Sequence, residues 1–121
     1  MTSELLSMAG SAGITGLCFH RGTEILHHSL PDIYGDAAAA ELCQAVVSAF
    51  IAYAGAERPL TQSYFQYPEN GVLVLTSPPA DRTHPDPATD FFLTFLVSDP
   101  AALPAIIAPA RGFLTKQARG A

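Results

Sequence analysis

Basic residues are scarce in this chain. Lys and Arg together number six against eleven Asp and Glu, which gives a formal net charge of −5. The cations are scattered, apart from Arg111, Lys116 and Arg119 near the end. A protein that binds a nucleic-acid backbone needs clustered positive charge, so we expect no nucleic-acid partner. The three basic residues near the end are better explained as cations that favour a helix C-terminus.

The chain also lacks long hydrophobic runs and a targeting segment. Its longest apolar stretches, 46–54 and 91–97, are well short of the about 20 residues that cross a bilayer. The N-terminus contains Glu4 and has no Lys or Arg before Arg21, which is unlike a secretory or transit peptide. We therefore expect no membrane insertion and a cytoplasmic protein.

Cysteine is limited to Cys18 and Cys43, which form no C-x-x-C motif and have no histidine at ligand spacing. The sequence has no P-loop, no dinucleotide-binding glycine pattern and no G-x-S-x-G elbow. We therefore expect reduced, buried thiols, no cofactor and no catalytic residue.

Three histidines lie near one expected hairpin: His20, His27 and His28. Adjacent strand residues point to opposite faces, so His27 and His28 cannot both face one ion, and we expect solvated imidazoles on an edge strand rather than a metal site. A nucleophilic pair of Cys18 and His20 would be separated by roughly 6.5 Å along the strand, which is long for direct proton transfer. A buried core cysteine is the favoured interpretation.

What the chain does have is a composition typical of one globular domain. It is 49% hydrophobic and 14% charged, and its 121 residues are enough for a core of sheet and helices. We therefore expect a single domain over residues 1–121. The patterns predict a helix over 3–9, strands over 14–20 and 23–30, a helix over 37–53, strands over 61–67, 72–76 and 90–97, and a last helix after Asp99 and Pro100.

The expected long helix has a very thin polar stripe. Its interior polar residues before Tyr53 are Glu41, Gln44 and Ser48, which share one face at helical spacing. Apolar residues line two other sides, and one of these consists of Ala40, Cys43, Val47 and Ile51. A helix with two apolar sides needs more cover than its own sheet provides. We therefore predict that Ala40, Cys43, Val47 and Ile51 form a seam with a second protein.

The segment 61–67 predicts an edge strand that also takes part in association. It alternates, with Gln62, Tyr64 and Gln66 on one face and Ser63, Phe65 and Tyr67 on the other. It contains no Lys, internal Pro or obvious bulge residue that would protect an open edge. We predict that Gln62, Tyr64, Phe65 and Gln66 belong to a dimer interface.

Turn and proline residues predict how these elements end. Asp36 is expected to cap the long helix, and Asn70-Gly71 to supply the positive φ angles of a tight hairpin turn. Segment 77–89 contains four prolines and three Asp or Arg residues, so we expect an exposed, solvated connection. Pro104 and Pro109 predict that the last helix is bent or broken.

The order of elements, the strand-turn-strand of residues 14–30, the alanine-rich central helix and the hairpin of residues 61–76 together resemble the Roadblock dynein light-chain family. The resemblance implies an α+β sandwich in which a five-stranded antiparallel sheet carries the long helix on one face and the terminal helices on the other. It also implies a homodimer formed by the third strands and the long helices, here 61–67 and 37–53.

The resemblance further implies a non-enzymatic regulatory or scaffold module that binds a small Ras-like GTPase. A second hypothesis is a small-molecule sensory module of profilin-like outline, with a pocket lined by Phe91, Phe95 and the long helix. An enzyme is the third, and its activity would depend on His27, His28 or Cys18.

Overall fold

The computed structural model describes residues 2–54, 60–68, 70–78 and 85–120. Within these ranges the elements follow the predicted order and form an α+β fold. The helices and strands are α1 (Thr2–Ala9), β1 (Ile14–Arg21), β2 (Glu24–His28), α2 (Gly35–Ile51), β3 (Gln62–Gln66), β4 (Gly71–Ser77), β5 (Phe91–Val97), the short 3₁₀ helix η1 (Pro100–Ala102) and α3 (Leu103–Gly120).

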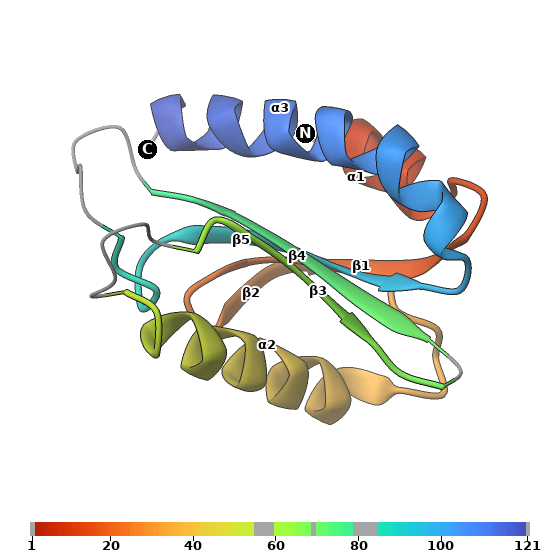
Figure 1. Ribbon diagram of the computed structural model, residues 1–121, viewed down its shortest axis with the longest axis horizontal. Helices are drawn as coiled ribbons and strands as arrows, with labels where there is room; N and C mark the ends of the chain where they lie inside the picture. Colours follow the sequence, from red (N-terminus) through yellow and green to blue (C-terminus); the bar gives the residue numbers. More distant parts are fainter. Residues whose placement is uncertain (1, 55–59, 69, 79–84, 121) are drawn as a thin grey trace.

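The five strands form one antiparallel sheet in the order β2-β1-β5-β4-β3. Helix α2 covers one face of the sheet, and α1 and α3 cover the other face (Figure 1). Strand β5 is the central strand and all seven of its residues are buried, as its nearly continuous apolar sequence predicts. The predicted fold class and layer arrangement are therefore confirmed.

The two faces of the sheet have separate cores because strand side chains alternate between them. Leu73 and Leu75 of β4 pack in the core beneath α1 and α3, together with Phe19 and Phe113, whose ring centroids are 5.0 Å apart. Val72 and Val74 pack on the α2 side. The inner strands β1, β4 and β5 therefore contribute to the cores on both faces of the sheet.

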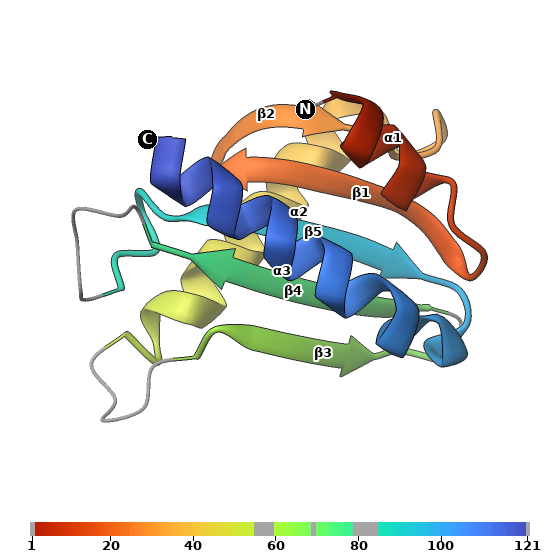
Figure 2. The same ribbon diagram turned by 90° about the horizontal axis from the view of Figure 1, so that it is seen from above.

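Helix α2 crosses its face of the sheet obliquely (Figure 2). Its N-terminal half packs over β1, where Ala39 and Cys43 contact Cys18. Its C-terminal half packs over β4 and β5, where Val46 and Phe50 lie in one cluster with Phe92. A single helix therefore needs apolar residues around a wide arc in order to cover this face.

Two expectations about local chemistry are wrong. Helix α2 begins at Gly35 with Tyr34 as N-cap and no side-chain cap, and the Asp36 carboxylate instead lies 3.1 Å from Nε2 of His28. Gly71 does not have a positive φ and belongs to β4, opposite Gln66. The reversal therefore begins earlier than predicted, and the N–H of Tyr67 donates to the carbonyl oxygen of Asn70 at 2.7 Å.

Prolines do not break α3. Pro104 lies in the first turn, where the missing N–H has no intrahelical acceptor, and Pro109 lies inside an unbroken helix. Ile106, Ala110 and Phe113 are buried against the sheet. This packing maintains the helix in spite of the hydrogen bond that Pro109 cannot donate, because tertiary contacts supply most of a helix's stability. Asp99 acts as a cap, as predicted, but of the short η1 that leads into α3 at Leu103: its carboxylate accepts from the N–H of Ala101 at 3.0 Å.

The connection after β4 is less exposed than predicted where the structure describes it. Pro87 is buried, and Asp90 is only 1% exposed and accepts a hydrogen bond from the N–H of Asp86 at 3.0 Å. The carbonyl oxygen of Asp90 also accepts from the N–H of Gly22. This end of the connection therefore packs on the turn between β1 and β2. Residues 79–84 lie outside the described ranges, as does Gly55, which was expected to end α2.

Among the described residues, no helix combines the length and the hydrophobicity that crossing a bilayer requires.

Candidate interaction surface

Strand β3 ends the sheet, and in the described ranges it pairs with β4 alone. Just beyond the two ends of β3, the N–H of Thr76 donates to the carbonyl oxygen of Thr61 at 3.0 Å, and the N–H of Tyr67 donates to the carbonyl oxygen of Asn70. Hydrogen-bonded pairs alternate along an antiparallel ladder, so the odd-numbered residues 61–67 bond toward β4. The backbone N–H and C=O groups of Gln62, Tyr64 and Gln66 therefore point to the open side of the sheet.

The side chain of Tyr64 packs on the α1 and α3 side of the sheet and reaches over Gly71 of β4. A Cβ atom placed on Gly71 would come 2.0 Å from its hydroxyl oxygen, so the tyrosine ring occupies the space that Gly71 leaves. The Tyr64 hydroxyl donates to Oε1 of Gln66 at 2.5 Å. Tyr64 is therefore held flat against its own sheet.

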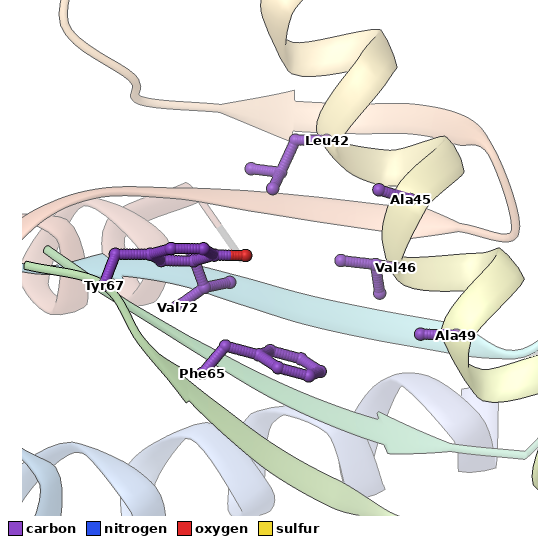
Figure 3. Close-up of a pocket in the computed structure, with 7 residues that line it drawn as sticks. All are labelled: Leu42, Ala45, Val46, Ala49, Phe65, Tyr67 and Val72. Carbon is purple, nitrogen blue, oxygen red and sulfur yellow. The ribbon is translucent and has the colours of Figure 1, made fainter.

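A groove of about 190 Å³ lies between β3 and α2. It is apolar, and Figure 3 shows the rings of Phe65 and Tyr67 reaching from the sheet toward the small side chains of α2. Phe65 is 38% exposed and Tyr67 is 56% exposed. The lining residues are Leu42, Ala45, Val46, Ala49, Phe65, Tyr67 and Val72. Solvent-exposed aromatic rings beside an open strand edge are typical of an association surface.

The structure places the four residues of the predicted helix seam in two different environments: two are exposed and two are buried. Ala40 and Ile51 are exposed, and Ile51 keeps 55% of its accessible surface. Cys43 is 0% exposed and Val47 is 5% exposed, because both side chains face the chain's own sheet. The expectation that Cys43 and Val47 lie on a free apolar side is therefore wrong. The oblique path of α2 explains the second apolar side without a partner.

The outward face of α2 is formed by small and polar residues together with Ile51. Its exposed residues include Ala40, Glu41, Gln44, Ala45 and Ser48. Small side chains permit a close approach of a second helix, because the interaxial distance depends on the side chains at the contact.

Periodicity alone did not identify Ala45 and Ala49 as groove residues. The alternation of β3, however, did place Tyr67 on the same face as Phe65.

Arg111 fixes the start of β3 from the other face of the sheet. Its Nη1 donates to the carbonyl oxygen of Thr76 at 2.7 Å, and its Nη2 donates to that of Thr61 at 3.0 Å. Burial lowers the pKa of the Arg111 guanidinium. Its interpretation as a helix-terminal cation is wrong, because Arg111 lies in the middle of α3 and Arg119 lies in the last turn.

The histidines of the β1–β2 hairpin have separate partners. His27 Nε2 lies 3.0 Å from the Ser29 hydroxyl, whereas His28 Nε2 lies beside Asp36. His20 is fully buried, unlike the solvated imidazole that was expected, and it stacks on Phe92 with a centroid distance of 5.1 Å. Within the ranges that the structure describes, no three His, Cys, Asp or Glu side chains form a group that could hold a metal ion.

No family model matches the chain, and no curated protein matches it in sequence. Solved structures do match it. MglB from Myxococcus xanthus superposes with a TM-score of 0.69 over 96% of this chain and 94% of that chain, at 9% identity. A structure described as MglB with a tetrameric arrangement superposes with a TM-score of 0.66 over 98% of this chain and 89% of that chain, at 14% identity.

The chain has the Roadblock fold. MglB is a Roadblock-family protein, so the resemblance suggested by the order of elements is confirmed at the level of the fold. Identities of 9% and 14% carry the comparison no further than the fold.

Proposed function

We propose that this chain is a self-associating module that binds and regulates a small Ras-like GTPase and has no turnover of its own. One observation carries the proposal: in a Roadblock fold, the open edge of β3 lies beside an apolar groove with exposed aromatic rings. An open edge and exposed apolar rings are both stabilised when a second chain covers them.

The partner in self-association is a second copy of this chain. The outward backbone groups of Gln62, Tyr64 and Gln66 pair with the same groups of a copy related by two-fold symmetry, which joins the two sheets. Phe65 lies against the partner's helix, and Ala40 and Ile51 of the two α2 helices approach one another. Cys43 and Val47 support α2 from behind. In support of self-association, one of the similar structures is described as tetrameric.

The GTPase is the partner class that the comparison supports. MglB is a GTPase-activating protein of the Roadblock family. A dimer joined through β3 places two α2 helices on one face and so offers a platform built from both chains. Glu41 is exposed on α2 and is available for a polar contact on that platform.

The test is the rate of GTP hydrolysis and of nucleotide exchange by small Ras-like GTPases from the same genome, with and without the purified chain. We expect one of them to change its rate by about tenfold or more, a change of about 1.4 kcal/mol in the barrier. Glu41→Lys should reduce this effect while the chain still self-associates. Glu24→Lys is the matched control, because Glu24 is also exposed but lies on β2 at the opposite edge of the sheet.

Two results would count against this proposal. If no GTPase responds and a small molecule copurifies with the chain, the sensory module is the better hypothesis. Its predicted pocket is not supported, because Phe91 and Phe95 are packed in the core on the α1 and α3 side. Hydrolysis of a substrate by the chain alone, lost in His27, His28 or Cys18 variants, would favour the enzyme.

A further inference from the structure

A second hollow, of about 370 Å³, lies beside Tyr34 at the start of α2. Its lining residues are Tyr34, Tyr67, Pro68, Asn70, Val72 and Leu96. Tyr67 and Val72 also line the groove between β3 and α2, so the hollow continues that groove toward the N-terminal end of the helix. The proposed function assigns no residue to this hollow.

Helix α2 and strand β3 run in opposite directions along the groove. Leu60, which precedes β3, packs in the same cluster as Phe50 near the C-terminal end of α2. At the other end, Tyr34 at the start of α2 lines the hollow together with Pro68, which follows β3. Because α2 crosses the sheet obliquely, it moves away from β3 toward its own N-terminus (Figure 2). The hollow is therefore the wide end of the space between helix and strand.

The opposite end of α2 has exposed apolar side chains. Ile51 is the last residue of α2 and is 55% exposed, and Tyr53, in the turn that follows, is 54% exposed. Ala52 keeps helical backbone angles, so Tyr53 follows Ala49 at helical spacing, on the side of the helix that lines the groove. A half-exposed tyrosine that continues an apolar stripe is typical of an interface anchor.

The two-fold dimer of the proposed function brings these two ends together. When two β3 strands pair antiparallel about a two-fold axis, the start of one strand lies beside the end of the other. The C-terminal end of α2 lies near the start of its own β3, so it comes next to the wide end of the other copy's groove. The relation is reciprocal, and the contact forms twice.

We propose that a second copy of the chain completes the hollow beside Tyr34: the ring of its Tyr53 enters the hollow, and its Ile51 covers the rim next to Ala40. This inference rests on the dimer of the proposed function, because only that pairing brings the two ends of α2 together. The entering ring meets the rings of Tyr34 and Tyr67, and its hydroxyl stays at the wet rim. Tyr53 is then the residue that selects the antiparallel arrangement of the two helices.

The first test is cross-linking between copies of the full chain. Ala52→Cys and Pro68→Cys each add one exposed thiol and leave Tyr53 in place, while the native cysteines are buried. We expect a short bismaleimide to join the two variants into a covalent dimer after they are refolded together. Each variant alone should give little, because its two copies of the new thiol lie at opposite ends of the dimer. No product from the mixture, or an equal yield from either variant alone, would overturn the inference.

The second test is the dimer dissociation constant, measured by sedimentation over a range of concentrations. Ile51→Asp and Tyr53→Asp each place a charge in an apolar contact, so each should raise the constant by about tenfold or more. Tyr53→Phe keeps the ring and should change it by less than about twofold. Leu6→Asp is the matched control, because Leu6 is also 55% exposed but lies on α1, on the other face of the sheet.

The results separate this inference from the proposed function. If both Asp variants of α2 associate as tightly as the wild-type chain, the dimer stands but the hollow belongs to another occupant, a GTPase or a small molecule, and the inference is wrong. A folded wild-type chain that stays monomeric would remove the dimer and the inference together.

Discussion

At the scale of single residues, two glycines share a left-handed backbone but differ in their surroundings. Gly22 has φ +55°, and a Cβ atom placed on it would lie 2.0 Å from the carbonyl oxygen of Ala88. Gly35 has φ +66°, and no heavy atom outside its immediate chain neighbourhood lies within 4 Å of a Cβ atom placed on it. The turn between β1 and β2 therefore depends on Gly22 for both its conformation and its contact with the segment before β5.

Substitution of these glycines should separate strain from steric overlap. We expect Gly35→Ala to lower the free energy of unfolding by about 1–2 kcal/mol, the cost of a left-handed L-residue. Gly22→Ala should cost about 3 kcal/mol or more, because the backbone of Ala88 must also move. Urea denaturation of both variants provides the comparison. Equal losses would show that Ala88 does not pack on the turn.

Arg111 gives a second test at this scale. Arg111→Met keeps much of the apolar stem but removes the donors to the carbonyl oxygens of Thr76 and Thr61, so we expect a loss of about 2 kcal/mol in unfolding free energy. Lys116→Met is the control. Its Nζ is 3.9 Å from Glu4 and its side chain is 69% exposed, so the expected change is within about 0.5 kcal/mol. An equally stable Arg111→Met variant would show that these two hydrogen bonds do not stabilise the fold.

Single residues were the hardest features to predict from sequence. Polar residue type suggested that His20 is solvated, yet it is buried, and its Nε2 contacts the hydroxyl of Thr94, which lies far along the chain. Local patterns contain no information about such partners. The buried, reduced state of Cys18 and Cys43 was predictable because it follows from composition and from strand and helix periodicity.

At the scale of elements, the sequence patterns predicted the α-helices and strands of the described ranges but not the separate η1, and the largest differences were at the ends of the elements. They did not predict the direction in which α2 crosses the sheet, because that direction depends on the twist of five strands. The seam assigned to Cys43 and Val47 was wrong for this reason. The edge position of β3 was predicted correctly, since the hairpin of 61–76 and the apolar β5 left β3 no second neighbour.

The open edge of β3 can be tested with a matched pair of prolines. Gln62→Pro removes an N–H that points away from the sheet, so it should weaken self-association and leave the unfolding free energy within about 1 kcal/mol. Ser63→Pro removes an N–H that bonds to β4 and should cost about 1–3 kcal/mol in stability. Urea denaturation and sedimentation of both variants give the two quantities. If both prolines affect stability equally, the assignment of the outward groups is incorrect.

At the scale of the whole molecule, the two faces of the sheet are covered unequally. Helices α1 and α3 both pack on one face, whereas α2 alone covers the other (Figure 1). One oblique helix leaves the β3 side of its face open, which is where the groove and the exposed rings of Phe65 and Tyr67 lie. The uneven cover therefore concentrates exposed apolar surface next to an unpaired strand edge.

The mass of the folded chain in solution tests this account most directly. Light scattering at low micromolar concentration should give twice the mass of one chain, because a two-fold dimer pairs the β3 edges and fills both grooves. A folded chain that scatters as a monomer at that concentration would contradict the account.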